Sequence, residues 1–515
     1  MISLSDEQKY AFEKFINNEN IFLSGPGGTG KTELIKKMLY SDKKGIQVCA
    51  MTGCAALLLG CGAKTIHSWS GIKLANGKKE DVVYSVAHSS FFKKMWKRTK
   101  VLIIDEISMM SQKIFEILDE IGKTIFGNNE PFGGIQVVFV GDFYQLPPVG
   151  NNEEPETGKF CFQSPLWNNV FKNENQIELT HIFRQSDPLY KSILLEVREG
   201  NISDKSIEIL KTRLINNSND IEIQQCSKIF PKRHKVDSIN ESYFHKLDST
   251  SINYFTKSNT NNTTYIDTGK EISDYDLYLA KKMSDAQKNY EIDNLLKSVP
   301  VNHSLSLKEG SRIMCCVNLD INNGICNGSQ GVIERFETNG SSDKKYPFVK
   351  FDNGVRMLIN EYVWQSELSP TISIQQIPLI LAWAITTHKI QGATLDSAQI
   401  DIGSNIFEYG QTYVALSRIK SLDGLHLTSF EPNKIKANPI VINFYENLKK
   451  TRKMIAETII EKDSKTESTE VSIKKSANEK DIKTIRHNIS PKSKKINDNS
   501  GNSMKITDFW NVKKV

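Results

Sequence analysis

The stretch from Gly25 to Thr32, Gly-Pro-Gly-Gly-Thr-Gly-Lys-Thr, restricts what this chain can fold into more than any other. It matches G-x-x-x-x-G-K-[ST], the pattern of a phosphate-binding P-loop. The glycines allow a tight turn in which backbone N–H groups converge on phosphate oxygens. An apolar run at residues 21–23 precedes the turn, and a helical pattern at 33–39 follows it, with its N-terminus toward the anion. The pattern predicts a phosphate site between a buried strand and a helix; a chance glycine turn is the alternative.

The end of this loop and a later strand suggest a metal site. Lys31 is placed to reach the β- and γ-phosphates of a nucleotide, and the Thr32 hydroxyl to hold Mg²⁺. A second apolar run, residues 101–104, ends in the carboxylates Asp105 and Glu106. Because ligands bind at the carboxyl ends of parallel strands, we expect Asp105 in the Mg²⁺ shell and Glu106 beside the attacking water. A solvated acidic turn is the alternative.

Further polar side chains stand at the ends of predicted elements. Gln8 lies in a capped helix before the loop, and its amide offers one donor and one acceptor to an adenine edge. Gln145 follows the apolar strand 136–140 and is a candidate sensor of the γ-phosphate. Arg184 follows the apolar residues Ile182 and Phe183, and Arg418 ends a predicted helix. Taken singly, each of these side chains also fits a solvated or purely structural position.

Small hydroxyl side chains gather where strands are expected to pass into helices. Thr52 follows the predicted strand 46–51, and Thr65, His67 and Ser68 follow the next helical segment. Such groups hold the phosphate oxygens of a nucleic-acid backbone. Simple helix capping explains them equally well.

The length of 515 residues predicts about three domains. Alternating strands and helices favour an α/β fold, and strand patterns between 310 and 368, with a hairpin at Asn353-Gly354, favour a small β-barrel inserted in it. The predicted divisions are a first lobe at 1–180 with an irregular basic insertion at about 70–98, a second lobe at 181–305 and 371–450, a barrel at 306–370, and a tail at 451–515. We expect residues 194–214 to be helical, 248–263 to be an exposed excursion, and 378–385 to resume the α/β pattern.

Charge is distributed unevenly along the chain. The net charge is +6, and residues 449–515 contain 17 Lys and Arg against 9 Asp and Glu, a net of +8, so the remainder carries 6 − 8 = −2. The tail is therefore basic in its own right, and its polar composition favours disorder. No apolar run approaches the ~20 residues of a membrane span. The polar N-terminus and eight cysteines without metal spacing predict an intracellular protein with reduced thiols.

Together these stretches resemble the PIF (petite integration frequency) family of DNA helicases, in subgroup B of superfamily one. The resemblance runs from about residue 3 to 430. The P-loop and the acidic pair occur in many ATPases, so later motifs in the family's order make it specific: Ile107-Ser-Met109, Pro131-Phe-Gly-Gly-Ile-Gln136, Gly141-Asp-Phe-Tyr-Gln-Leu-Pro-Pro-Val149, Phe183-Arg-Gln185, His388-Lys-Ile-Gln-Gly392 and Tyr413-Val-Ala-Leu-Ser-Arg418.

The resemblance implies two RecA-like P-loop lobes with parallel sheets, ATP and Mg²⁺ in the cleft between them, and an SH3-like β-barrel inserted in the second lobe. It also implies a monomer that translocates 5′-to-3′ on single-stranded DNA and unwinds duplex and forked DNA. The implied processes are replication, repair, recombination and telomere maintenance, in the nucleus or another compartment where DNA is replicated.

Carried over motif by motif, the resemblance gives each site residue a role. In the ATP site these are Gln8 for adenine; Gly25, Pro26, Gly27, Gly28, Thr29, Gly30, Lys31 and Thr32 for the phosphates; Thr32 and Asp105 for Mg²⁺; Glu106 for the attacking water; and Gln145, Arg184, Gly392 and Arg418 for the γ-phosphate. On the DNA side they are Thr52, Thr65, His67, Ser68, Thr386 and His388. Thr387 departs from the apolar residue expected there. No long N-terminal extension precedes the first helix, so we expect regulation located there to be absent.

The last residues carry a separate resemblance. The stretch Ser503-Met-Lys-Ile506-Thr-Asp-Phe509-Trp510 is similar to the peptide by which replication proteins dock on the sliding clamp, proliferating cell nuclear antigen. One helical turn would place Ile506, Phe509 and Trp510 on one face, as a plug for an apolar pocket. Ser503 stands where a glutamine is usual, and a hydrophobic chain end docking on the body is the alternative.

Two other functions fit the P-loop alone. The first is an ATPase that remodels protein or protein–DNA complexes without strand separation, against which the motifs at 388–392 and 411–418 argue. The second is a scaffold driven by its tail, with a vestigial ATPase. The intact set of Lys31, Asp105, Glu106, Arg184 and Arg418 argues against that scaffold.

Overall fold

The computed structural model describes residues 4–451, except 60, 74, 76, 152, 216–225, 261–276, 279–280, 300, 321–322, 326, 339–343, 367–370, 388–389 and 391. Of the tail predicted at 451–515, only position 451 is described, so the predictions for Ile506, Phe509 and Trp510 lie outside the described residues. The prediction for His388 lies outside them as well. The described residues belong to one compact unit that ends at Arg452. Among the helices described, none is long and apolar enough to cross a membrane.

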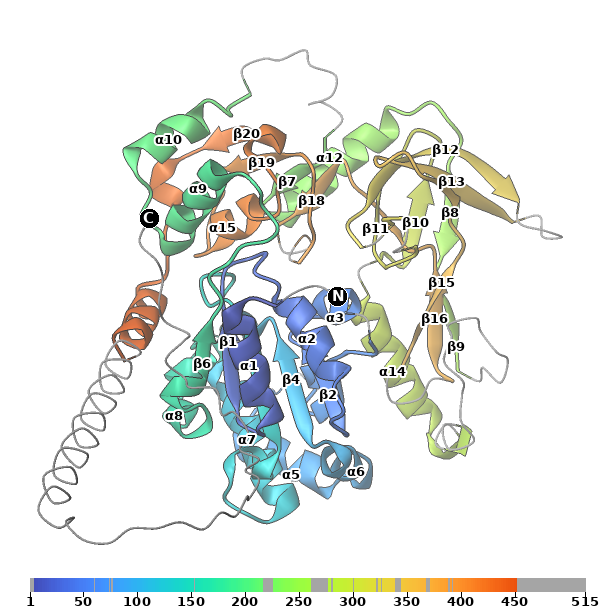
Figure 1. The fold of residues 1–515 in the computed structure, drawn as a ribbon. Coiled ribbons are helices and arrows are strands. Elements are labelled where there is room, and N and C mark those ends of the chain that lie inside the picture. Colours follow the sequence, from blue (N-terminus) through green and yellow to red (C-terminus); the bar gives the residue numbers. More distant parts are fainter. Residues whose placement is uncertain are drawn as a thin grey trace, which may run out of the picture. The chain divides into compact units, whose positions relative to one another are not determined.

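The first lobe is built on a six-stranded parallel sheet (Figure 1). Its strand order is β3-β2-β4-β5-β1-β6, with β1 (Ile21–Ser24), β2 (Ile46–Ala50), β3 (Lys64–Thr65), β4 (Val101–Asp105), β5 (Gln136–Gly141) and β6 (Gln176–Glu178). Side chains alternate between two cores: Ile21 and Leu23 face one, and Phe22 faces the other. This alternation places helices on both faces of the sheet, as the apolar runs predict.

Each face of this sheet has its own set of helices. One core takes side chains from α1 (Asp6–Ile16), α2 (Lys31–Leu39) and α3 (Gly53–Leu59). The other takes side chains from α4 (Ile66–Ser70), α5 (Lys79–His88), α6 (Ser90–Arg98), α7 (Gln112–Phe126) and α8 (Trp167–Val170). The prediction of an irregular insertion at 70–98 is thus wrong over α5 and α6. Ser89 caps α6, and Trp96 buries its ring there against Trp69.

The second lobe is built on a four-stranded parallel sheet, so the α/β fold class is confirmed. Its order is β18-β7-β19-β20, with β7 (Lys228–Phe230), β18 (Ala384–Thr386), β19 (Ala398–Ile402) and β20 (Leu425–Phe430). The helices near it are α9 (Pro188–Glu199), α10 (Asp204–Lys211), α12 (Arg233–His245) and α15 (Gln411–Leu416). The helix expected at 194–214 is two helices, because Gly200 adopts a left-handed φ of 70° and ends α9.

Antiparallel strands separate the segments of the second lobe. A five-stranded sheet has the order β14-β13-β12-β11-β17, with β11 (Arg312–Cys315), β12 (Gln330–Thr338), β13 (Lys345–Phe351), β14 (Arg356–Leu358) and β17 (Leu379–Leu381). Two smaller sheets combine β15 (Tyr362–Gln365) and β16 (Ser373–Gln376) with β9 (Lys257–Asn259), and β10 (Ser304–Leu307) with β8 (Ile252–Phe255). Helix α14 (Asp285–Ser298) lies between β9 and β10 in the chain.

The structure refines two expectations about these strands. Residues 248–263 were expected to be an exposed excursion; most of residues 248–260 are exposed, but they include β8 and β9, and Tyr254 of β8 is 2% exposed. Residues 378–385 were expected to resume the α/β pattern. They do so in β18, which is parallel to β7, whereas β17 is antiparallel to β11 and belongs to the five-stranded sheet.

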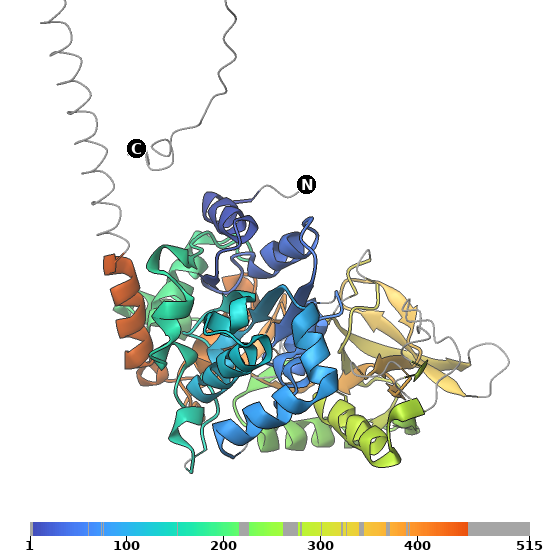
Figure 2. The same cartoon turned by 90° about the horizontal axis from the view of Figure 1, so that it is seen from below.

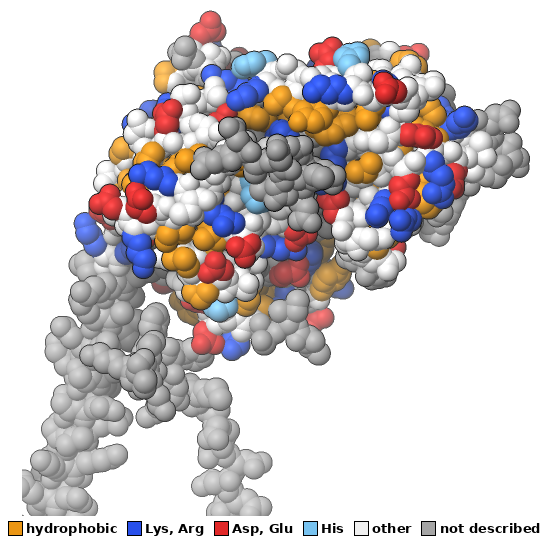
Figure 3. Space-filling model, turned by 90° about the horizontal axis from the view of Figure 1, so that it is seen from above, with side chains coloured by type: hydrophobic (Ala, Val, Ile, Leu, Met, Phe, Trp, Pro, Cys, Tyr) orange, Lys and Arg blue, Asp and Glu red, His pale blue; other side chains and the backbone are white. Residues whose placement is uncertain are grey.

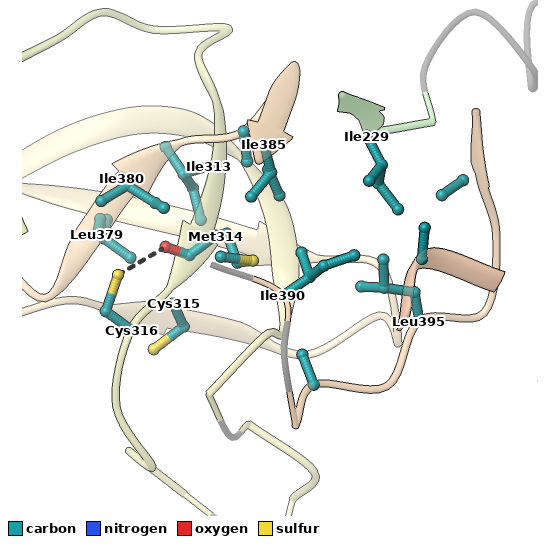
Figure 4. Close-up of a cluster of buried hydrophobic side chains, with 14 of the residues drawn as sticks. Ile229, Ile313, Met314, Cys315, Cys316, Leu379, Ile380, Ile385, Ile390 and Leu395 are labelled. Atoms are coloured by element: carbon teal, nitrogen blue, oxygen red, sulfur yellow. Dashed lines mark hydrogen bonds between the residues drawn. The ribbon is translucent and has the colours of Figure 1, made fainter. Parts of the chain in front are cut away.

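The antiparallel region and the second lobe share a core (Figure 4). Ile229 of β7 and Ile385 of β18 belong to the same buried cluster as Ile313 of β11 and Leu379 of β17. The thiol of Cys316 donates to the carbonyl oxygen of Met314 within this cluster. The antiparallel strands are therefore packed into the lobe rather than attached by a linker.

A final helix, residues 439–451, returns to the first lobe (Figure 2). Val441, Tyr445 and Leu448 lie in the core of the face that carries α7. The ring of Phe444 stacks on that of Phe162 at 4.3 Å. The sequence-based division, which assigns residues up to 450 to the second lobe, differs from this packing.

Candidate nucleotide-binding site

Three neighbouring strands of the first sheet bring the predicted phosphate and metal residues to one edge. Strands β4, β5 and β1 are adjacent and parallel, so their carboxyl ends meet. The P-loop follows β1, the acidic pair ends β4, and the segment 141–145 follows β5. Residues about 120 positions apart in the chain thus converge for a topological reason that follows from the strand order.

The P-loop is tightly packed against its surroundings. Gly25 has a φ of 148°, and a Cβ there would lie 2.6 Å from the carbonyl oxygen of Leu179. The ammonium of Lys31 donates to the carbonyl oxygens of Gly25, at 2.6 Å, and Pro26, at 3.0 Å. Burial lowers the pKa of Lys31, although the nearby carboxylates, led by Asp142, oppose this shift. The loop therefore holds a half-buried cation that an anion would stabilise.

Gln8 lies directly over the loop. Its Nε2 donates to the carbonyl oxygen of Thr29 at 3.2 Å, and its Oε1 accepts from the amide of Ser5 in a capping box. A Cβ on Gly30 would approach Gln8 Nε2 to 2.7 Å. The structure thus places Gln8 beside the start of α2, where it also caps α1.

Asp105 and Glu106 form a strained acidic turn after β4. Asp105 is buried, its Oδ1 accepts the amide of Glu106 at 2.8 Å, and burial together with Glu106 raises its pKa to about 7. Glu106 adopts a left-handed φ of 56°, a conformation that costs on the order of 1–3 kcal/mol for such a residue. A carboxyl group that is costly to ionise here would be stabilised by a cation, so the turn fits a Mg²⁺ ligand.

Gln145 supplies an unsatisfied polar atom at the same edge. Its side chain is buried, and among the described residues no hydrogen-bond partner is found for its Oε1. Its backbone amide donates to the carbonyl oxygen of Asp142 at 2.9 Å. Buried amide oxygens are nearly always hydrogen-bonded, so this one fits a group that contacts water or ligand.

Arg184 and Arg418 converge on the third residue of the P-loop. A Cβ on Gly27 would lie 3.4 Å from Arg418 Nη2 and 3.5 Å from Arg184 Nη1. Arg184 donates to the carbonyl oxygen of Ser417, and Arg418 donates to the Ser417 hydroxyl. Burial, followed by the neighbouring Arg418, lowers the pKa of Arg184 to about 10, and burial also lowers that of Arg418. A half-buried and a buried guanidinium side by side would be stabilised by an anion.

Tyr413 is a contact that the sequence interpretation named in a motif but gave no role. Its hydroxyl accepts the amide of Gly27 at 2.8 Å, so α15 of the second lobe touches the P-loop directly. Burial raises the pKa of this hydroxyl to about 12. Tyr413 lies within α15 and Arg418 follows the end of that helix. The place of Tyr413 in the same motif as Arg418 is the sequence signal that could have indicated the contact.

A second junction joins Asp142 to α9. The guanidinium of Arg198 donates to both carboxylate oxygens of Asp142, each at 2.9 Å, and to Glu178 at 3.2 Å. Although burial opposes it, the pKa of Arg198 is raised because Asp142 lies so close. No local pattern in the sequence marks Arg198, which occupies the last turn of an ordinary amphipathic helix.

The hydroxyl residues predicted on the nucleic-acid side cap two helices. Thr52 accepts the amide of Ala55, and Thr65 accepts the amide of Ser68, both at 3.2 Å. Strands β2 and β3 pair so that Thr65 lies opposite Ala50, which brings these two turns together. Burial lowers the pKa of His67, so this ring is neutral at neutral pH. Capping uses the hydroxyl oxygen as an acceptor and leaves its proton for a phosphate.

Other predicted residues lie apart from the contacts described above. Thr32 occupies the first turn of α2, and Thr386 ends β18. Gly392 lies in a turn after β18 with a φ of 82°. The predicted roles of these three residues stay predictions.

These features define a class: a P-loop protein whose phosphate site is faced by cationic side chains from outside its own sheet. Comparison with known proteins narrows the class. The model of the PIF1-like helicase family matches residues 3–208, and that of the DNA helicase Pif1 2B domain matches residues 292–336.

Relatives and solved structures agree with these matches. The ATP-dependent DNA helicase PIF1 of Xenopus laevis is 33% identical over 468 residues, covering 88% of this chain and 65% of that protein. The crystal structure of Pif1 helicase from Candida albicans is 32% identical with a TM-score of 0.67, covering 87% of this chain and all of that one. Pif1 from Bacteroides is 27% identical in two structures that each cover 88% of this chain and 98% of theirs: in complex with ADP-AlF4, with a TM-score of 0.69, and bound to ssDNA, with a TM-score of 0.60.

The chain belongs to the family of PIF1-like helicases. It spans about two thirds, 65%, of the length of the Xenopus relative. The resemblance drawn from the motifs is therefore confirmed at the level of the family.

Proposed function

We propose that the chain is an ATP-dependent DNA helicase that moves 5′-to-3′ on single-stranded DNA and unwinds duplex. The observation that carries this proposal is the convergence of Arg184, Arg418 and Tyr413 on Gly27. Hydrolysis would then depend on how closely α15 approaches the P-loop. Because α15 belongs to the second lobe, this dependence would couple the nucleotide cycle to movement of the two lobes. The relatives' names, and the Bacteroides complexes with ADP-AlF4 and ssDNA, support both ligands.

The chemistry would rest on positioning and charge. Lys31 would leave its loop carbonyls for the β- and γ-phosphates, and the two arginines would face charge that develops on the γ-phosphate. Thr32 and Asp105 would hold Mg²⁺, which neutralises phosphate charge when bound. Glu106, fixed by its strained backbone, would accept a proton from the attacking water.

DNA would be held mainly through its phosphates. The turns at Thr52 and Thr65–Ser68, with Thr386 and His388, are the proposed contacts. The face seen in Figure 3 mixes Lys and Arg with Asp and Glu. This mixture of charges fits the net charge of −2 outside residues 449–515. DNA would therefore be bound by local groups and not by a uniformly basic surface.

Matched 5′-tailed and 3′-tailed duplexes test the activity and its direction in one experiment. With ATP and Mg²⁺, the 5′-tailed duplex should be unwound and the 3′-tailed duplex should not. Unwinding of only the 3′-tailed duplex would overturn the direction, and unwinding of neither would overturn the helicase.

An ATPase that remodels protein is the competing function. It would hydrolyse ATP without a response to DNA. We expect single-stranded DNA to raise the rate of ATP hydrolysis at least tenfold, a rise of the size that lobe closure over a preorganised site provides. A rate that does not change with DNA would favour the competing function.

The remaining proposals concern organisation. The antiparallel strands between β11 and β17 would form an SH3-like barrel, and the chain would act as a monomer. It would work where DNA is replicated, such as the nucleus. Sedimentation with and without forked DNA tests the monomer.

The tail from about residue 451 would be disordered and would add affinity for DNA of any sequence. Its basic composition supports this, because each released counterion steepens the dependence of binding on salt. A chain that ends at residue 451 should keep its ATPase activity and show a shallower slope of log affinity against log salt concentration. An unchanged slope would show that the tail does not contribute to DNA binding.

The tail would also dock on the sliding clamp through Ile506, Phe509 and Trp510. A flexible tether would raise the concentration of the enzyme at replication forks without restraining its motion. The test is titration of a peptide covering residues 500–515 against the clamp of the same source. Absence of binding at about 100 µM, a generous limit for a short motif, or equal binding by the Phe509→Ala/Trp510→Ala peptide, would overturn this docking.

A further inference from the structure

One buried hydroxyl group behind the nucleotide site has no place in the mechanism above. Tyr445, on the helix 439–451, shares a hydrogen bond of 2.5 Å with Ser24 and accepts the amide of Phe143 at 3.2 Å. Ser24 is the residue before Gly25, and Phe143 lies two residues before Gln145. A single side chain from the end of the described chain thus joins the starts of two loops in the site.

The surroundings of this hydroxyl are closed and rigid. Its ring stacks on that of Tyr144 at 4.8 Å with an interplanar angle of 9°. The guanidinium of Arg198 lies 4.6 Å from the Tyr144 ring and 5.3 Å from the Tyr445 ring, while it clamps Asp142. Ser24 and Asp142 are fully buried. Such a network has few alternative arrangements, because each buried polar group would lose its partner.

We propose that Tyr445 is a positioning residue of the nucleotide site. Its hydroxyl fixes the start of the P-loop relative to the loop that carries Gln145, and Arg198 fixes that second loop through Asp142. The helix 439–451 therefore belongs functionally to the phosphate site, although it is the last described element of the chain. This inference rests on the proposed function only in that the site binds a nucleotide.

The test compares Tyr445→Phe with Tyr254→Phe in the full chain. Tyr254 is also buried, and its hydroxyl donates to the carbonyl oxygen of Lys345 at 2.9 Å, in the antiparallel region. Both substitutions remove one buried hydroxyl and keep the ring. The Tyr445 hydroxyl contacts Ser24, the Phe143 amide and Asp142, whereas that of Tyr254 has one partner, so Tyr445→Phe should lower Tm more than Tyr254→Phe does. Only Tyr445→Phe should weaken Mg·ADP binding and lower the kcat of ATP hydrolysis, each roughly tenfold, the upper end of what one hydrogen bond contributes.

A double-mutant cycle tests the bond itself. Ser24→Ala should weaken Mg·ADP binding in the same direction, and Ser24→Ala/Tyr445→Phe should weaken it no further than Tyr445→Phe alone, because the Ser24–Tyr445 bond that Ser24→Ala removes is already absent in Tyr445→Phe. Additive losses, or Mg·ADP affinity and kcat in Tyr445→Phe equal to those of Tyr254→Phe, would overturn the proposal. A wild-type chain that binds Mg·ADP but shows no DNA-stimulated turnover would overturn the helicase function and leave this inference standing.

Discussion

The two lobes reach similar parallel sheets by different routes. The first lobe takes its six strands from one continuous stretch, residues 21–178, and separates two cores by strict alternation along β1, β4 and β5. The second lobe takes its four strands from two distant segments, residues 228–230 and 384–430, and its core merges with that of the antiparallel region. The first lobe is thus encoded locally, while the second is encoded by contacts between distant segments.

The difference extends to the nucleotide site. The first lobe holds the groups that would bind phosphate and metal, and α15 of the second lobe supplies Tyr413 and Arg418. Arg184 lies on the connection between the lobes and bonds both to Ser417 and, through its amide, to the carbonyl oxygen of Gly28. The comparison implies that changes in the first lobe abolish binding or chemistry outright, while changes in the second lobe spare nucleotide binding and slow turnover.

The largest effect is expected for Lys31→Ala in the first lobe. It should abolish unwinding and nearly all ATP hydrolysis, because the β- and γ-phosphates lose the cation that the P-loop itself supplies. The control is Lys36→Ala on the same helix, where the side chain is exposed and pairs with Glu33. If the measured turnover of Lys31→Ala is close to that of the control, Lys31 does not contact the phosphates as proposed.

Variants of the two arginines should lose turnover but keep their affinity for nucleotide. Arg184→Ala and Arg418→Ala should each lose roughly 10³-fold in turnover, by analogy with arginine fingers, and keep their affinity for Mg·ADP. Arg335→Ala, an exposed arginine of β12, is the matched control. If either site variant loses only a few-fold in turnover, that arginine serves structure and not chemistry.

Glu106→Gln should lie next in size. We expect at least ~10²-fold slower hydrolysis, as for loss of a positioned general base, with ATP and DNA binding retained. Glu120→Gln controls for loss of a first-lobe carboxylate, because Glu120 is exposed on α7. Near-normal turnover in Glu106→Gln would show that another group accepts the proton.

Sequence patterns located the first lobe well because its signals are local. The P-loop, the run ending at Asp105 and the apolar strand 136–140 each mark one strand, and strand order alone brings their ends together. Sequence patterns did not separate β17 from β18 within residues 378–385, because an apolar run does not reveal its pairing partner. They missed β8 and β9 because their partners, β10 and β16, lie far along the chain.

Local sequence patterns also identified only some of the residues in the nucleotide site. Motifs identified Lys31, Arg184 and Arg418, which the structure gathers around the P-loop. They could not identify Arg198 or Tyr445, because neither residue lies in a local pattern of its own. Both matter only through tertiary contacts, one across the junction with α9 and one through the return of the helix 439–451.

The smallest effect is expected for Tyr413→Phe, and it tests the comparison most sharply. This change keeps the ring and removes one hydrogen bond, from the Gly27 amide to a second-lobe hydroxyl. Such a bond contributes about 0.5–1.5 kcal/mol, so the population in which the arginines stand over Gly27 should fall about 2- to 10-fold. Turnover should fall by the same factor, while Mg·ADP affinity stays at the wild-type value because the phosphate-binding groups are in the first lobe. Tyr409→Phe, a more exposed tyrosine just before α15, is the control. If Tyr413→Phe weakens Mg·ADP binding as much as it slows turnover, the hydroxyl supports the P-loop itself, and the division of labour between the lobes fails at this contact.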